Sequence, residues 1–261
     1  MSKRSASFPR TGQACGAAWL VFVALGPPTL AQDTKARPVS YGMEIAFGSG
    51  HADRGFIISD RPVIQPVAWV SERGAEVSLW SSVSLDRNTD GSRPEILEME
   101  LTREFEWKHI TIGPAITMFS YHNAFSTDYD RSIEAWLYLS YDLGPLRLFT
   151  NHSLDVLTNP GAYTGEAGIA FDGRASPEIE IGGSFGAGWA SAAFNDDYAG
   201  IPRSAFDRLS AEAWLTAHGG RHFYISPHVE FSTILDRRVR AGADVLRPTY
   251  VLVGLATGVE F

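Results

Sequence analysis

The stretch Tyr250-Val-Leu-Val-Gly-Leu-Ala-Thr-Gly-Val-Glu-Phe261, at the end of the printed chain, decides the fold class. Its residues alternate with a period of two, which indicates a β-strand whose two faces meet different surroundings. A strand of about ten residues with one apolar face suits a transmembrane β-barrel, and the last strand of a soluble β-sandwich is the alternative. The apolar face carries Val251, Val253, Leu255, Thr257, Val259 and Phe261, and the other face carries Leu252, Gly254, Ala256, Gly258 and Glu260.

Similar alternating segments precede this stretch, and short turns alternate with longer polar loops between them. This rhythm predicts an all-β fold, a transmembrane up-and-down antiparallel β-barrel of about twelve strands. Both termini and the short turns are then expected in the periplasm, with the long loops outside. The terminal Phe261 is typical of a closing strand that the barrel-assembly machinery recognises. The predicted strands are 41–48, 63–70, 76–85, 97–107, 110–121, 133–141, 146–155, 163–171, 179–189, 209–217, 223–231 and 250–261.

The start of the chain has the pattern of a secretory signal peptide. Basic residues precede an apolar run at 17–25, which is too short to span a membrane as a helix, and Ala31 is placed for cleavage. The sequence therefore predicts export to the bacterial outer membrane. The predicted division is 1–31 signal peptide, 32–38 periplasmic leader and 39–261 outer-membrane β-barrel.

Composition limits the partners. The formal net charge is −8, which argues against a nucleic-acid partner. The single cysteine, Cys15, lies in the predicted signal peptide, so no disulfide is expected in the mature chain. The basic loop 237–240, with Arg247, is predicted either to bind lipopolysaccharide phosphates at the outer rim or to be a solvated loop. Outer-membrane lipid and lipopolysaccharide are the expected partners, and the oligomeric state is left open.

Charged residues gather on the face of the strands that is predicted to point inward. Carboxylates crowded in a lumen favour cations, so we predict a porin-like channel for small solutes with a cation preference. The alternative is a plugged structural barrel without transport, in which Glu and Arg side chains pair across the lumen. The predicted pore-lining residues are Glu44, Glu98, Glu100, Glu134, Arg147, Glu166, Glu180, Arg208, Glu212 and Glu230.

Four residues inside the predicted strands do not fit this pattern. Arg103 interrupts the apolar face of its strand, so a bulge or a position near the rim is required. Pro66, Pro114 and Pro227 each remove a hydrogen-bond donor from the sheet. Aromatic residues near strand ends predict the two interfacial girdles of a barrel, against ordinary strand propensity as the alternative. These are Tyr41, Trp69, Trp107, Tyr121, Tyr141, Tyr163, Phe171, Trp189, Phe223 and Phe261.

The main alternative function is an outer-membrane lipid or peptide hydrolase, for which His122 beside Asp128 and Asp130 is the best candidate. His218 and His222 flank a turn but have no further metal ligand in sight. The glycine-rich run 182–188 alternates within a strand with no helix after it, so it is predicted to let the sheet bend. We predict no enzyme activity, no catalytic residues, no cofactor and no metal.

The segment Asp53-Arg-Gly-Phe-Ile-Ile-Ser-Asp-Arg-Pro-Val-Ile-Gln-Pro66, followed by a turn at 71–74 and a strand that contains Trp80, resembles the opening of the TorF-type porins. The shared features are Arg54-Gly55, Pro62 and Trp80, and a later hairpin around Gly144-Pro-Leu146 is also similar. Pro66 departs from the family pattern. The resemblance implies an outer-membrane porin-like barrel and no particular solute.

Overall fold

The computed structural model describes residues 39–86, 95–122, 131–242 and 247–261. The predicted signal peptide (1–31) and periplasmic leader (32–38) lie outside these residues. No helix within them is long and apolar enough to cross a membrane.

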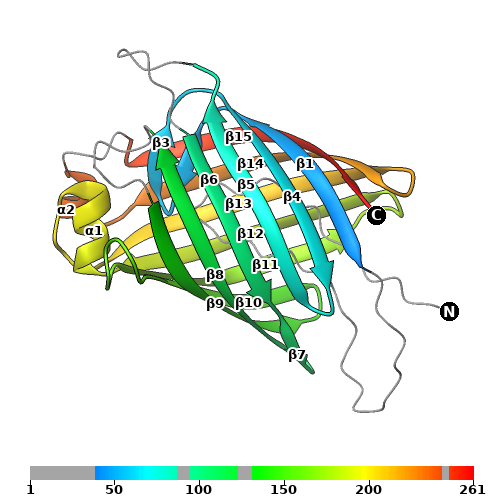
Figure 1. Ribbon diagram of the computed structural model, residues 1–261, viewed down its shortest axis with the longest axis horizontal. Helices are drawn as coiled ribbons and strands as arrows, with labels where there is room; N and C mark the ends of the chain where they lie inside the picture. The colour runs from blue at the N-terminus through cyan, green and yellow to red at the C-terminus, as the bar shows by residue number, and fades with distance from the viewer. Residues whose placement is uncertain (1–38, 87–94, 123–130, 243–246) are drawn as a thin grey trace.

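The strands form one antiparallel sheet that closes into a twelve-stranded barrel (Figure 1). The predicted closing strand, β15, pairs with β1 in a register that runs from Gly42↔Glu260 to Gly48↔Gly254. All twelve predicted strands are present, and β6 and β7 are two pieces of a single one. The barrel strands are β1 (Ser40–Gly48), β4 (Val63–Glu72), β5 (Ala75–Ser84), β6 (Glu95–Arg103), β7 (Phe105–Trp107), β8 (Ile110–His122), β9 (Arg131–Leu143), β10 (Leu146–Asp155), β11 (Tyr163–Arg174), β12 (Ile179–Ala190), β13 (Ala205–Gly219), β14 (Phe223–Ile234) and β15 (Thr249–Glu260).

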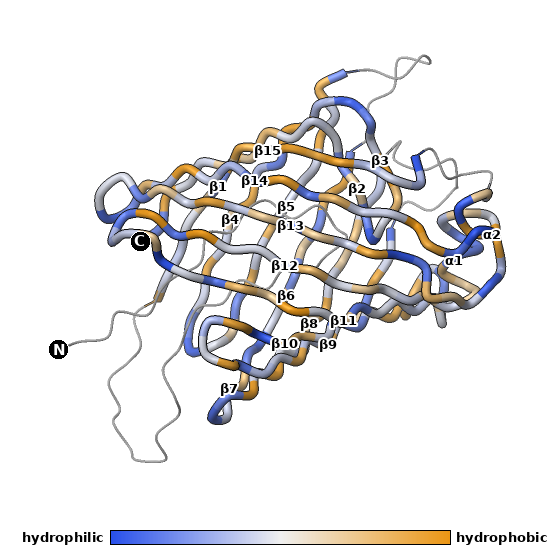
Figure 2. The backbone as a smooth tube through the Cα atoms, turned by 180° about the vertical axis from the view of Figure 1, so that it is seen from behind, coloured by the Kyte–Doolittle hydropathy of each residue, from blue (hydrophilic) through white to orange (hydrophobic). Residues whose placement is uncertain are grey.

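The outward face of the barrel is apolar and the inward face is polar. In β15, Val251, Val253 and Leu255 are 61%, 56% and 48% exposed, whereas Ala256 is fully buried. Hydrophobic and hydrophilic residues alternate along the strands, and hydrophilic residues gather at their ends (Figure 2). A soluble monomer rarely exposes so large an apolar surface, so hydrocarbon is the medium that this surface fits.

The three prolines lie on the outward face, and each coincides with a gap in one hydrogen-bonded ladder. Between β6 and β8 the pairing stops at Thr102↔Ala115 and resumes in the same register at Phe105↔Ile112. The gap lies opposite Pro114, which has no N–H to donate. The missing donor therefore explains why one barrel strand divides into β6 and β7. Equivalent gaps include Pro66 in the β4–β5 ladder and Pro227 in the β13–β14 ladder.

Arg103 is tolerated on the outward face because it lies at the rim. It pairs with Ala75, the first residue after a tight turn, and its guanidinium lies 5.5 Å from the centroid of the Phe105 ring. The rim position, and not a bulge, therefore accommodates this charge.

The girdle prediction is wrong for two residues. Trp69 is only 5% exposed and lies on the inward side, over Gly42 of the neighbouring strand, where a Cβ would collide with its ring. Tyr121 stacks on the inward-facing Phe119. Nearness to a strand end does not determine which face a residue occupies, because the face depends on the phase of the alternation. The other girdle residues that are exposed at strand ends are Tyr41, Trp107, Tyr141, Phe171, Phe223 and Phe261.

The glycines of the run 182–188 make room for large inward side chains of neighbouring strands. A Cβ at Gly182 would collide with the Trp214 ring, and one at Gly188 would collide with Arg208. Both are directly paired residues on β13. The close approach of side chains, beyond the predicted bending, therefore explains these glycines.

The end of the barrel opposite the C-terminus carries structure that the strand pattern did not predict (Figure 1). The polar stretch after β1 contains a second small sheet, β2 (His51–Asp53) and β3 (Phe56–Ser59). The later loops contain α1 (Ala192–Ala199) and α2 (Arg237–Arg240), capped by Ser191 and Asp236. These elements pack together through an apolar cluster whose buried members are Phe56, Ala162, Ala190, Phe194, Ala199, Ile234 and Val239.

Candidate functional site

The barrel lumen is the candidate functional site, because it gathers most of the polar side chains predicted to act there. Every predicted pore-lining residue lies on the inward, buried or half-buried side of its strand. Their lining of an open pore stays a prediction. These residues are Glu44, Glu98, Glu100, Glu134, Arg147, Glu166, Glu180, Arg208, Glu212 and Glu230.

Several of these charges are paired within the barrel wall. Arg208 Nη2 lies 3.7 Å from Glu166 Oε2, and Glu166 also accepts a hydrogen bond from Ser210. Arg174 Nη2 lies 2.7 Å from Glu180 Oε1. Part of the acidic set is therefore neutralised, as the alternative of a filled lumen expects.

Arg147 and Glu44 are also held in place. Arg147 donates to Asp142 Oδ1 at 3.0 Å and lies 3.5 Å from Asp172. Glu44 accepts a 2.6 Å hydrogen bond from the Tyr224 hydroxyl, and it is only 1% exposed. These contacts fix the side chains against the wall near the end that carries the short turns.

Glu212 and Glu230 form a different arrangement. They are direct partners on β13 and β14, so two carboxylates face each other on the inward side. Glu230 accepts a 3.1 Å hydrogen bond from Tyr250, and no ion pair among the described residues includes either glutamate. Two ionised carboxylates placed opposite each other repel, and either a proton or a nearby cation relieves that repulsion.

The hairpin formed by β2 and β3, residues 51–59, folds into the half of the lumen that lies away from the C-terminus. Its turn is Arg54-Gly55, with φ values of +47° and +96°, and Asp53 pairs with Phe56 across it. Two successive positive φ values are the geometry of a type I′ turn, which suits a two-residue hairpin and favours glycine at its second position. Arg54 is thereby carried to the tip of the hairpin, inside the barrel.

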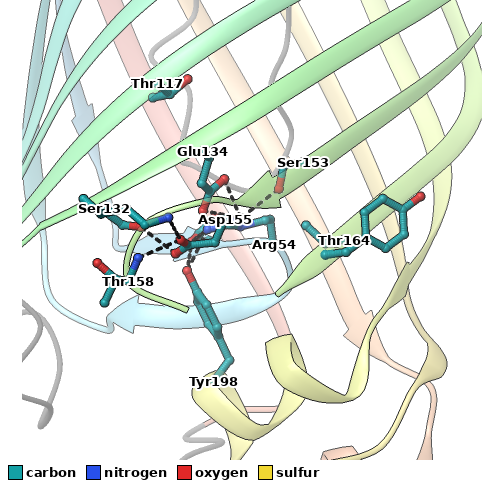
Figure 3. Close-up of polar contacts among 12 residues, drawn as sticks. Arg54, Thr117, Ser132, Glu134, Ser153, Asp155, Thr158, Thr164 and Tyr198 are labelled. Atoms are coloured by element: carbon teal, nitrogen blue, oxygen red, sulfur yellow. Dashed lines mark hydrogen bonds and ion pairs between the residues drawn. The ribbon is translucent and has the colours of Figure 1, made fainter. Parts of the chain in front are cut away.

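Arg54 joins the hairpin to the barrel wall and to α1 (Figure 3). Its Nη1 donates to both carboxylate oxygens of Glu134 at 2.9 Å and to Ser153 Oγ at 3.2 Å. Its Nε and Nη2 donate to Asp53 at 2.9 Å, and Nη2 also donates to the Tyr198 hydroxyl at 2.7 Å. The guanidinium is only 3% exposed, so this is a fully buried ion pair with its donors satisfied.

Aromatic rings surround the same guanidinium. Its central carbon lies 5.0 Å from the centroid of the Phe194 ring, 5.4 Å from that of Tyr198 and 5.8 Å from that of Trp136. These distances lie within the range of cation–π attraction, which strengthens when the cation is desolvated. Charge, hydrogen bonds and aromatic faces therefore all hold the tip of the hairpin.

The rest of the hairpin touches other parts of the wall. His51 Nδ1 lies 3.1 Å from Gln65 Nε2 on β4, and Ile57 packs against Tyr250 on β15. Arg208 on β13 donates a 3.1 Å hydrogen bond to the carbonyl oxygen of Arg54. With Glu134 on β9, these contacts reach the wall from several directions, so the hairpin crosses the lumen as a plug.

Burial perturbs the titration of the hairpin. Desolvation lowers the pKa of His51 to about 4, and the nearby Asp53 carboxylate opposes this shift. Desolvation also acts to lower the pKa of Arg54, but Asp53 and Glu134 outweigh it and raise that pKa well above its usual value. The arginine is therefore charged and the histidine neutral while the hairpin is docked at neutral pH.

The sequence contains a signal for this hairpin that the periodicity of the barrel strands does not reveal. The tripeptide Glu72-Arg73-Gly74 forms a tight turn, and Asp53-Arg54-Gly55 has the same acidic-Arg-Gly pattern. Short strands flank it on both sides. Buried polar residues such as His51 and Asp53 give the stretch a loop-like composition, which conceals the strands.

The alternative catalytic candidate at His122 stays a prediction. His152 and Ser153 are adjacent in β10, so their side chains lie on opposite faces: His152 is outward and bonds Tyr163 and Thr150, whereas Ser153 is inward and accepts from Arg54. The acidic neighbours proposed for His122, residues 128 and 130, lie outside the described residues.

The two turn histidines have separate contacts. His218 Nε2 lies 3.6 Å from Glu180, and His222 stacks on Phe261. The described part of the chain contains no group of His, Cys, Asp and Glu residues that could hold a metal ion.

Comparisons with known proteins support the fold. No protein-family model and no curated protein matches the chain. The structure is similar to an outer-membrane channel from Pseudomonas putida F1, with a TM-score of 0.50, 8% identity, and coverage of 88% of this chain and 100% of that chain. It is also similar to the KdgM porin, with a TM-score of 0.45, 10% identity, and coverage of 85% and 98%. At these identities the likeness concerns the fold alone, and the chain adopts the architecture of an outer-membrane β-barrel.

Proposed function

We propose that this protein is an outer-membrane, porin-like channel for small solutes, and that its lumen prefers cations. The observation that carries the proposal is the closed barrel with an apolar outside and a carboxylate-rich inside. A wet, charged lumen in hydrocarbon surroundings suits the passage of polar solutes. The similar solved structures include proteins described as a channel and as porins, which agrees with this function.

The cation preference depends on charges that arginine does not neutralise. Glu166 and Glu180 have arginine partners, so they contribute little net field. Glu212 and Glu230 face each other without an ion pair among the described residues. They are therefore the best candidates for the residues that set selectivity.

Planar-bilayer recordings of the refolded protein test the channel. Under a KCl gradient we expect a reversal potential on the side that indicates cation selectivity, and we expect Glu212→Gln combined with Glu230→Gln to move it toward zero. Anion selectivity in the unmodified protein contradicts the cation preference, and the absence of conductance in every variant contradicts the channel.

A plugged structural barrel is the second candidate, and the docked hairpin favours it. If the hairpin seals the lumen permanently, the unmodified protein does not conduct. In that case, only a variant that releases the hairpin passes current, because its barrel is open. Comparing the two proteins separates a gated channel from a permanent seal.

Location and partners follow from the same proposal. We propose export through the predicted signal peptide with cleavage near Ala31, insertion by the barrel-assembly machinery through the strand that ends at Phe261, and contact with lipopolysaccharide at the outer rim. The exposed α2 arginines, Arg237, Arg238 and Arg240, are the best phosphate ligands there, whereas Arg247 is bound to Asp60 at 3.0 Å. Membership of the TorF-type porins is part of the proposal and rests on the Arg54-Gly55, Pro62 and Trp80 motifs.

A further inference from the structure

The surroundings of Arg54 include parts that do not belong to the hairpin. Glu134 and Trp136 lie on β9, Ser153 lies on β10, and Phe194 and Tyr198 lie on α1. Together these five residues supply one carboxylate, two hydroxyl oxygens and three aromatic faces. Figure 3 shows Glu134, Ser153 and Tyr198 beside Arg54. Strands β9 and β10 and helix α1 thus provide these contacts independently of the hairpin.

The geometry of these contacts matches a planar cation. Both oxygens of Glu134 accept from one guanidinium nitrogen, and the Tyr198 hydroxyl accepts from another at 2.7 Å. The Phe194 and Tyr198 rings stack at 4.4 Å beside the guanidinium. Divergent N–H donors on a flat group suit this arrangement better than the compact point charge of an ammonium.

We propose that Glu134, Trp136, Ser153, Phe194 and Tyr198 form a guanidinium receptor, and that Arg54 is its tethered ligand. The proposal deepens the proposed function, on which its biological role rests, because the hairpin closes the lumen by occupying this receptor. Free solutes that carry a guanidinium group are the class that the receptor takes when Arg54 is removed. Such a solute binds in the half of the lumen that lies away from the C-terminus, on the path that a permeating molecule follows.

The hairpin contains the feature that this receptor requires, a turn that presents the ligand. Arg54 and Gly55 adopt the type I′ geometry, so the guanidinium projects from the tip. Gly55 also lies close to Arg208, where a Cβ would be 3.1 Å from Arg208 Cδ. The turn is therefore fitted closely to the wall while its arginine occupies the receptor.

Chemical rescue of Arg54→Ala by methylguanidinium tests the receptor. Saturation-transfer NMR on the detergent-refolded variant is expected to show methylguanidinium bound with millimolar affinity, at least tenfold tighter than methylammonium. The unmodified barrel is expected to bind at least tenfold more weakly, because Arg54 competes. The Arg54→Ala, Glu134→Gln double variant is expected to lose binding, and Arg73→Ala, at an exposed turn, is expected to behave as the unmodified protein.

Each outcome decides the proposal. Equal binding of methylguanidinium to the single and double variants overturns it, as does tighter binding of methylammonium. If Arg54→Ala refolds only when methylguanidinium is present, the yield itself supports the receptor, and Arg54→Gln provides a second variant for the binding measurement. Binding requires no conduction, so a barrel that binds but passes no current contradicts the channel and leaves the receptor in place.

Discussion

Two turns of this protein share an acidic-Arg-Gly pattern and positive φ values at the arginine and the glycine. Asp53-Arg54-Gly55 lies at the tip of the hairpin in the lumen, and Glu72-Arg73-Gly74 joins β4 to β5 at the rim. Both pairs have positive φ values, +47° and +96° for the first and +53° and +80° for the second. The side chain of Arg54 is 3% exposed, whereas that of Arg73 is 67% exposed.

The comparison shows that the local acidic-Arg-Gly pattern determines the turn, whereas the residues around the turn determine the role of its arginine. Arg73 lies 3.4 Å from Glu72 in solvent, and an exposed pair of this kind contributes about 0–1 kcal/mol. Arg54 neutralises Glu134 in a buried site, and removal of one partner from such a pair costs about 3–5 kcal/mol. Arg73 is therefore an exposed surface charge, whereas Arg54 holds its turn against the barrel wall through a buried ion pair.

The largest expected effect comes from the matched pair Arg54→Ala and Arg73→Ala. Loss of Arg54 leaves the Glu134 carboxylate buried without a counter-ion, so we expect the hairpin to leave the lumen and the single-channel conductance to rise severalfold. Arg73→Ala is expected to change neither conductance nor the temperature at which the barrel unfolds on a gel. Equal behaviour of the two variants contradicts the role assigned to the buried turn.

Acidification is the second way to disturb the lumenal turn. The pKa of His51 falls from 6.5 to about 4 on burial. The imidazole therefore binds a proton more weakly in the docked hairpin than in the released hairpin. Docking is therefore at full strength above pH 6.5 and weakens as the pH falls toward 4, by about 3 kcal/mol at the lower limit. Conductance should rise over this range, and His51→Gln, which keeps a polar partner for Gln65, should remove this rise. An identical pH profile in the variant argues against His51 as the sensor.

The third test asks whether paired and facing carboxylates differ in function. Glu212→Gln with Glu230→Gln removes two carboxylates that form no ion pair among the described residues, so the cation-to-anion permeability ratio should fall severalfold. Glu178→Gln, at an exposed turn, alters the net charge outside the lumen and should leave the ratio unchanged. Equal shifts in both proteins indicate a general effect of net charge and contradict a selectivity site.

The smallest effect is expected from Ser153→Ala. This change removes one acceptor of Arg54 and keeps both ionic partners, so docking should weaken by about 1 kcal/mol. The measurement is the fraction of time that a single channel spends open, which should rise modestly and remain below that of Arg54→Ala. A rise equal to that of Arg54→Ala shows that the Arg54–Glu134 ion pair is not the main interaction that holds the hairpin in the lumen.

The alternation of apolar and polar residues along each strand determines much of the fold. It identifies every barrel strand and places Glu134 and Arg208 on the inward face, because a period-two pattern with one apolar face is compatible with few structures other than a β-strand between two environments. It could not determine that Glu134 meets Arg54 from a segment 80 residues away, or that Glu212 and Glu230 are direct partners. Strand registers and loop paths fix those contacts, and neither follows from one strand alone.

The sequence by itself therefore determined that this chain closes into a barrel with hydrocarbon outside and charge inside. Only the tertiary structure decided that the stretch after β1 turns inward, since its polar residues gain partners from strands distant in the sequence. The physical reason is that hydrophobic periodicity is local, whereas the free energy of burying Arg54 depends on Glu134, Ser153 and Tyr198 arriving at the same point in space.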